Sequence, residues 1–281
     1  MKKSNNNSWR PILLFLSILT ILSSVVHIAI VKLYPSSLYI GALMWCPAIA
    51  TFITLKLLNR KLKTLPWKWP NKNILFRSYG IPMLYVTITY ILLWSLGLGS
   101  FRSNEEITAW ATEIGIIGIG SLPPYLSLVI GIVILATVGV IKSMATVLGE
   151  EIGWRGFFII ELRKKLSFTG VSLFSGFIWA IWHWPLIYYY GSNIALEFTT
   201  FFIVIISMSF VMTYYTFKSK SLWPAVIFHT VSNVFVQKIF PPITNATNEF
   251  EHWHGEYGIM FAIVTLLFGV YYWRKGIKDQ L

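Results

Sequence analysis

The sequence predicts an all-α polytopic membrane protein with about eight transmembrane helices and both termini on the cytoplasmic side. Of its 281 residues, 56% are hydrophobic and only 12% are charged, and the mean hydropathy is +0.64. A soluble domain has about a quarter charged residues, so most of this surface must face lipid. Membrane β-barrels show alternating segments of about 10 residues. The apolar runs here are longer and continuous, which favours helices.

Eight apolar runs are separated by loops that alternate in charge. The runs cover residues 11–31, 38–58, 74–96, 126–157, 169–190, 196–217, 222–240 and 257–273. Both ends and every second loop are basic, with Lys2, Lys3, Arg10, Lys56, Arg60, Lys61, Lys63, Lys68, Lys72, Arg77, Arg163, Lys164, Lys165, Lys218, Lys220, Arg274, Lys275 and Lys278. The intervening loops contain Glu105, Glu106, Glu113, Glu249 and Glu251. The positive-inside rule then places both termini in the cytoplasm, as an even number of crossings requires.

The chain divides into three parts along its length. Residues 1–125 hold the first three helices and an outer loop, 126–240 hold the polar motifs, and 241–281 hold a loop and the last helix. The net charge of +12 does not indicate a nucleic-acid partner, because the basic residues lie between apolar runs, where they suit anionic lipid headgroups. Cys46 is the only cysteine, which excludes an internal disulfide and a Cys/His metal finger.

The fourth run ends in an unusual polar cluster, Gly-Glu-Glu-Ile-Gly-Trp-Arg-Gly at 149–156. Charges on a membrane helix cost at least a few kcal/mol each. Glu151 and Arg155 are four residues apart, so they can pair on one helix face. Glu150 is rotated by about 100° from Glu151 and projects elsewhere, without a local partner. An ion-pair cluster at a helix end explains Glu151 and Arg155 better than it explains Glu150.

Two later runs carry histidines. His183 follows Trp179 by four residues in the fifth run, and His229 precedes Asn233 by four residues in the seventh. Alone, each could be a hydrogen-bonded packing residue, because His and Asn often bond across membrane helices. Counted from the nearest basic residues at 1.5 Å per residue, Glu150 and these groups lie about 13 to 27 Å into the membrane. Three polar motifs at compatible depths on separate helices favour one shared site.

The remaining histidines lie outside the three motifs and are not expected to belong to the shared site. His252 and His254 fall in an outer acidic loop, and His27 stands alone in the first run, where it is expected to pack or to lie near the surface. A carboxylate and a histidine that share a water can act as general base, and a second His with an Asn suits an oxyanion. This set fits amide hydrolysis by an activated water. Two His and one Glu are also the ligands of one type of hydrolytic zinc site, although the sequence has no His-Glu-x-x-His motif.

The three motifs together resemble a known family. Glu-Glu-x-x-x-Arg at 150–155, Trp-x-x-x-His at 179–183 and His-x-x-x-Asn at 229–233 are similar, in this order, to the motifs of the CPBP family. This is the CAAX-protease and bacteriocin-processing (Abi) family of intramembrane proteases. The resemblance covers about residues 126–240, and one departure is Trp179 where the family has Phe.

The resemblance implies an eight-helix fold and a role for each matched residue. Glu150 and His183 would activate water, and His229 and Asn233 would stabilise the oxyanion. The supporting residues would be Glu151, Arg155 and Trp179. The family has been described both as metalloproteases and as glutamate proteases. We favour the second form, with no required cofactor; the alternative is zinc or another divalent metal held by Glu150, His183 and His229.

Other functions stay open at this point. Buried Glu and His also mark ion paths, so a transporter or proton relay is the alternative, although repeated halves are absent from the sequence. An immunity or scaffold protein could keep the motifs without turnover. The expected partners are the lipid bilayer of a bacterial cell membrane and a peptide or membrane-protein substrate, in bacteriocin processing or self-immunity. The sequence assigns no oligomeric state.

Overall fold

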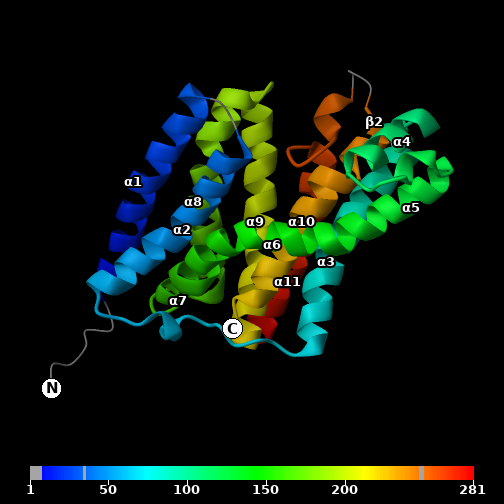
Figure 1. Cartoon of the computed structure of the whole chain (residues 1–281). Coiled ribbons are helices and arrows are strands. Elements are labelled where there is room, and N and C mark those ends of the chain that lie inside the picture. The colour runs from blue at the N-terminus through cyan, green and yellow to red at the C-terminus, as the bar shows by residue number, and fades with distance from the viewer. Residues whose placement is uncertain (1–7, 34–35, 247–249) are drawn as a thin grey trace.

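The computed structural model describes residues 8–33, 36–246 and 250–281, which form a bundle of helices (Figure 1). The α-helices are α1 (Arg10–Lys32), α2 (Ser37–Leu57), α3 (Lys72–Ser95), α4 (Asn104–Glu113), α5 (Pro124–Ile134), α6 (Val140–Glu151), α7 (Ile159–Leu162), α8 (Phe168–Tyr190), α9 (Ile194–Ser219), α10 (Trp223–Asn233) and α11 (Ile259–Lys278). The π-helical segments are η3 (Leu135–Gly139), η4 (Ile152–Phe158) and η5 (Val234–Ile239). The short 3-10 helices are η1 (Leu62–Thr64), η2 (Ile119–Ser121), η6 (Pro241–Ile243) and η7 (Glu251–Trp253), and β1 (Ser100–Phe101) pairs antiparallel with β2 (Thr244–Asn245).

The predicted fold class is confirmed, because each of the eight apolar runs is helical and the protein is a multi-pass membrane protein. Within the described residues, six helical stretches are long and apolar enough to cross a membrane: Arg10–Lys32, Ser37–Leu57, Lys72–Ser95, Pro124–Leu162, Phe168–Tyr190 and Ile194–Ser219. The last two runs form α10–η5 and α11, which are not among these six. The predicted number of crossings therefore stays a prediction.

Most of the basic connections lie at one end of the bundle, at the bottom of Figure 1, where α1 begins and α11 ends. Ion pairs join segments there: Arg60 Nη2 is 2.7 Å from Glu161 Oε1, and Lys218 Nζ is 2.8 Å from Asp279 Oδ2. The start of α1 and the end of α11 thus share one side, which agrees with the charge pattern. Which side is cytoplasmic stays a prediction, and Lys2, Lys3 and Glu249 lie outside the described residues.

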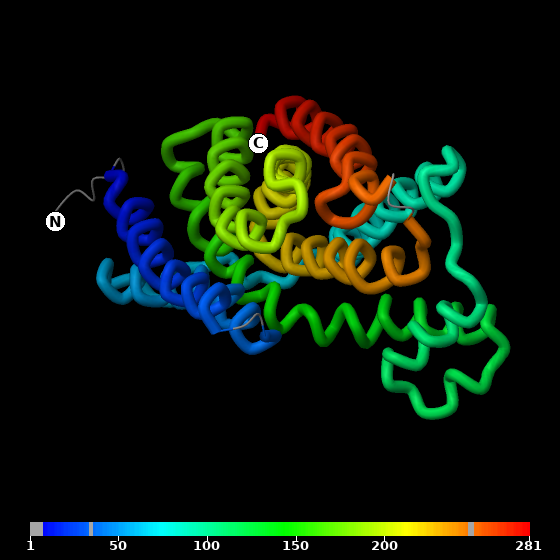
Figure 2. The backbone as a smooth tube through the Cα atoms, turned by 90° about the horizontal axis from the view of Figure 1, so that it is seen from above, coloured from blue at the N-terminus to red at the C-terminus, as the bar shows by residue number. Residues whose placement is uncertain are grey.

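The long helix from α5 to α7 does not run alongside its neighbours. Its α6 segment runs across α2 and α10, and Figure 2 shows α9 nearly end-on with α8, α10 and α11 around it. Gly149 and Gly153 permit the crossing, because a Cβ on Gly149 would lie 2.7 Å from the backbone oxygen of Met44. Small residues at this spacing let membrane helices approach closely. A count of residues along the chain does not contain this crossing, and packing of α6 against α2 positions Glu150.

Gly153→Ala is expected to lower the stability of the protein by about 1–3 kcal/mol, the usual cost of overpacking. The added Cβ would lie 2.3 Å from Pro47 Cβ and 2.9 Å from the Pro47 backbone, so α6 and α2 must separate. Thermal unfolding in detergent measures the effect. Gly80→Ala on α3 is the control, because a Cβ there has no neighbour within 4 Å. Equal shifts in both variants would contradict the crossing as the cause.

Candidate active site

Two of the three helices that carry the motifs, α6 and α10, change from α-helix to π-helix directly after their polar residues. Glu150 and Glu151 end α6, and the π-helical segment η4 follows at once. Asn233 ends α10, and the π-helical segment η5 follows in the same way. Single π-helical turns are rare and occur mostly at functional sites. Both motifs therefore stand where the backbone departs from regular helix.

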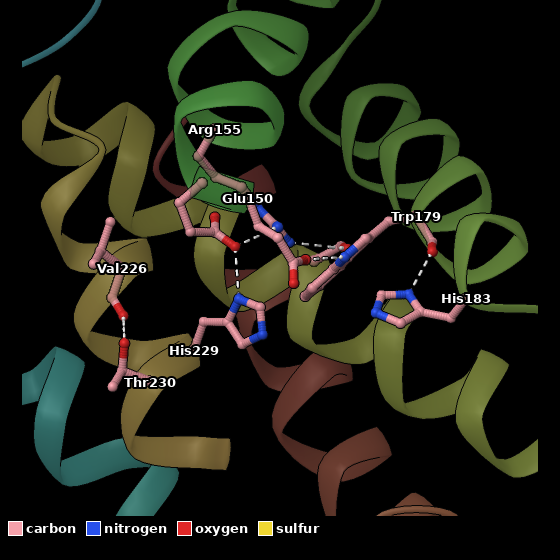
Figure 3. A network of polar contacts seen from close by, with 9 residues as sticks. Glu150, Arg155, Trp179, His183, Val226, His229 and Thr230 are labelled. Carbon is pink, nitrogen blue, oxygen red and sulfur yellow. Dashed lines mark hydrogen bonds and ion pairs between the residues drawn. The ribbon is translucent and has the colours of Figure 1, made fainter. Parts of the chain in front are cut away.

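Glu151 is the centre of a buried ion-pair network. Its Oε1 accepts from Arg155 Nη1 at 3.0 Å and from His229 Nδ1 at 2.8 Å, and neither Glu151 nor Arg155 is more than 1% exposed (Figure 3). The Glu151–Arg155 pair predicted from the spacing is confirmed. The pair has a third member that the spacing did not predict, because His229 shares the same oxygen from α10, 78 residues away.

Glu150 has a partner on α8. Trp179 Nε1 donates to Glu150 Oε2 at 3.0 Å, and the carboxylate is 2% exposed. The guanidinium of Arg155 lies 4.1 Å above the ring of the same tryptophan. Glu150 thus has no partner on its own helix, as the spacing indicated, and its partner is a tryptophan from another helix. Glu150 Oε1 is left free to meet a water or a substrate group.

In the imidazole rings of His183 and His229, one nitrogen already has a hydrogen-bond partner. His183 Nδ1 lies 2.9 Å from the backbone oxygen of Trp179, and a carbonyl can only accept, so Nδ1 carries the hydrogen. His229 Nδ1 donates to Glu151 for the same reason. In Figure 3 the Nε2 atoms of the two rings point toward each other across the space beside Glu150. Each ring thus presents Nε2 to that space, as an acceptor when neutral or as a donor when charged.

One cavity of about 240 Å³ collects the predicted residues. Glu150, Trp179, His183, His229 and Asn233 all line it. Apolar side chains close it from the other helices: Ile40, Leu43 and Met44 of α2, and Phe201, Val204, Ile205 and Met208 of α9. Within the part of the chain that the structure describes, the Asn233 carboxamide has no protein hydrogen-bond partner. Its amide is therefore available to a bound group.

Sequence reasoning missed two polar residues of this cavity, Gln237 and Glu256. Gln237 Nε2 donates to Glu256 Oε2 at 2.8 Å. Gln237 follows Asn233 by four residues and His229 by eight, so the same spacing rule could have found it. Glu256 lies in the loop before α11 and has no such signal. Burial raises the pKa of the Glu256 carboxyl above its usual range, and the hydrogen bond from Gln237 offsets only part of that rise.

The three histidines outside the motifs, His27, His252 and His254, do not line the cavity. His254 Nε2 bonds the backbone oxygen of Leu98 at 2.6 Å in the outer loop, where it was expected. His27 is buried and packs its ring edge-on against Trp182, with centroids 6.2 Å apart, which fits the expected packing role. Trp182 itself lines the cavity, so His27 stands behind its wall.

The metal alternative needs Glu150, His183 and His229 to converge as ligands. Trp179 occupies only Glu150 Oε2 and Glu151 occupies only His229 Nδ1, so Glu150 Oε1 and the Nε2 atoms of both imidazoles are not bonded to the protein. Among the described residues, however, no group of three His, Cys, Asp or Glu side chains is arranged to hold a metal ion. The three residues therefore do not fit a metal in this arrangement.

Known proteins share the part of the chain that holds this site. The family model of type II CAAX prenyl endopeptidase Rce1-like proteins matches residues 124–235. The CAAX prenyl protease 2 of Methanococcus maripaludis is 28% identical over 147 residues, which cover 47% of this chain and 48% of that protein. The chain thus spans about half the length of the curated relative it matches. Both matches point to the CAAX-protease-like family that the three motifs resemble, and residues 124–235 hold all three motifs.

Proposed function

We propose that this chain is an intramembrane endopeptidase that hydrolyses peptide bonds of a peptide or membrane-protein substrate with an activated water. One arrangement supports this most strongly. Glu150, His183, His229 and Asn233 line a single cavity, and each imidazole has Nδ1 fixed and Nε2 facing inward. The family and the name of the relative support the same class of reaction.

Glu150 and His183 form the base. A water between the free Glu150 oxygen and His183 Nε2 gives up a proton to this pair as its oxygen attacks the carbonyl carbon. Trp179 holds both groups, because its indole donates to Glu150 and its backbone oxygen accepts from His183. A base placed in this way contributes about 10²–10⁴-fold to the rate.

His229 and Asn233 stabilise the oxyanion. Addition of water moves the carbonyl π electrons onto oxygen, and the Asn233 amide and a protonated His229 Nε2 donate to it. Glu151 is the counter-ion of the His229 ring, so the charged ring is paired before substrate binds. Collapse of the intermediate breaks the C–N bond. The amine leaves with the proton held by Glu150 and His183, giving a carboxylic acid and an amine.

The proposal is tested with purified protein in liposomes and a set of internally quenched membrane peptides. Wild type is expected to cleave at least one peptide and to place one ¹⁸O from labelled water in the new carboxylate. His183→Ala is expected to bind the same peptide without cleaving it. Ion and proton flux are recorded in the same vesicles.

Two outcomes would reject endopeptidase activity. Flux that depends on Glu150 and His183, without cleavage of any peptide, would establish the transporter alternative. Peptide binding without turnover or flux would establish a non-catalytic immunity protein.

Removal of metal is expected to leave the rate of peptide cleavage unchanged. The proposed water activation needs only a carboxylate and an imidazole, and the described residues offer no group of three metal ligands. The protein is dialysed against EDTA or 1,10-phenanthroline, and its residual metal is measured by mass spectrometry. A loss of activity that added zinc restores would favour the metal-dependent form.

A further inference from the structure

Acidic side chains outnumber cationic ones in the lining of the cavity. Two carboxylates line it, Glu150 and Glu256, against one ring that the proposed mechanism makes cationic, His229, and the described lining includes no lysine or arginine. The Arg155 guanidinium is buried outside the lining and is paired with Glu151. A substrate carboxylate would therefore meet like charge here, whereas a cation would meet a complementary site.

Glu256 has only weak partners among the described residues. The one hydrogen bond to its carboxylate within that part of the chain comes from a neutral amide, Gln237 Nε2, at 2.8 Å. His229 adds an electrostatic attraction from a distance, but the ring is already paired with Glu151. A half-buried carboxylate whose partner is neutral gains from a cation that brings charge-assisted hydrogen bonds. The other Glu256 oxygen is the place for such a group.

The position of the Gln237–Glu256 pair indicates how far it lies from the scissile bond. His229, Asn233 and Gln237 all line the cavity from α10 and η5, and Gln237 stands at most about 6 Å further along the axis than Asn233. An extended peptide advances about 3.3 Å per residue. The pair is thus about two residues from the oxyanion donors. Tyr257, next to Glu256, also lines a wider outer cavity of about 840 Å³, so the pair stands on the side from which a peptide can enter.

We propose that Glu256, held by Gln237, binds an organic cation of the substrate about two residues from the scissile bond. The cation is the side chain of a lysine or arginine, or the free α-ammonium of a peptide. Glu256 then selects basic peptides without taking part in the bond-breaking step. This inference rests on the proposed endopeptidase function.

Selectivity is measured with one cleavable peptide in which each position within three residues of the cut carries lysine, norleucine or glutamate. In wild type, lysine at one position is expected to raise kcat/KM at least about tenfold over norleucine. Glu256→Gln keeps a side chain of the same shape and is expected to abolish that preference, leaving norleucine peptides unchanged. Glu256→Lys is expected to reverse the preference toward glutamate. Acetylated and free N-termini separate a side-chain cation from an α-ammonium.

Glu105→Gln is the matched control, because it removes the same charge from an exposed position that lines neither the catalytic nor the outer cavity. It is expected to keep the lysine preference. Equal losses for lysine and norleucine peptides in Glu256→Gln would show that Glu256 supports the machinery and would overturn the proposal. So would a wild type without a lysine preference.

Binding separates this proposal from the endopeptidase function. Fluorescence anisotropy with labelled lysine and norleucine peptides is recorded on liposomes of His183→Ala, with and without Glu256→Gln. A lysine preference in binding that needs Glu256, with no cleavage by wild type, would keep the cation site and reject the protease. Cleavage by wild type with no dependence on Glu256 would do the reverse.

Discussion

Glu150→Gln is expected to lower kcat for peptide cleavage by about 10²–10⁴-fold and to leave the fold intact. Glutamine still accepts the hydrogen bond from Trp179 Nε1, which the carboxylate receives at 3.0 Å, so the packing of α6 against α8 is kept. The amide cannot take a proton from water. His183 alone then has to act as base, without the second oxygen that would share the water.

The measurement determines kcat and KM separately. KM and peptide binding are expected to stay near the wild-type values while kcat falls, because Glu150 acts on the water and not on the bound peptide. Glu105→Gln, an exposed carboxylate at the start of α4, is the control for charge removal. A Glu150→Gln variant with wild-type kcat would remove Glu150 from the role of base. Raised KM alone would assign it to substrate binding.

Hydropathy located the helices well because lipid leaves backbone groups no partner except those within a helix. Each apolar run became helical, and the start of α1 and the end of α11 lie at one end of the bundle, which agrees with the charge pattern. Hydropathy could not give the direction of α6. That direction depends on Gly149 and Gly153 meeting Met44 to Pro47 of α2, a contact between residues about a hundred positions apart.

The site was predictable where its geometry is local. The spacing of four residues gave the Glu151–Arg155 pair and put His229 and Asn233 on one face. The spacing of residues within one helix could not predict the contacts between helices. The bonds from Trp179 to Glu150 and from His229 to Glu151 depend on how α6 crosses its neighbours, and Glu256 comes from a loop without periodicity.

Glu151→Leu is expected to cost about 3–5 kcal/mol of stability and to abolish cleavage. The change leaves the Arg155 guanidinium, 1% exposed, without its paired carboxylate. Removing one partner of a buried pair costs more than removing both, because a single charge stays uncompensated. It also removes the acceptor that fixes His229 Nδ1, so the ring is free to turn away from the oxyanion.

A second variant separates these two effects. Glu151→Leu with Arg155→Met removes both charges, and methionine keeps an apolar contact over Trp179, where the guanidinium lies 4.1 Å from the ring. Thermal unfolding is expected to return toward wild type, whereas cleavage stays lost, because His229 still lacks its acceptor. Recovery of cleavage in the double variant would mean that Glu151 only neutralises Arg155. A stable single variant would instead assign the counter-ion of Arg155 to Glu150, whose charge also acts on the guanidinium, so Glu150 could not serve freely as the base.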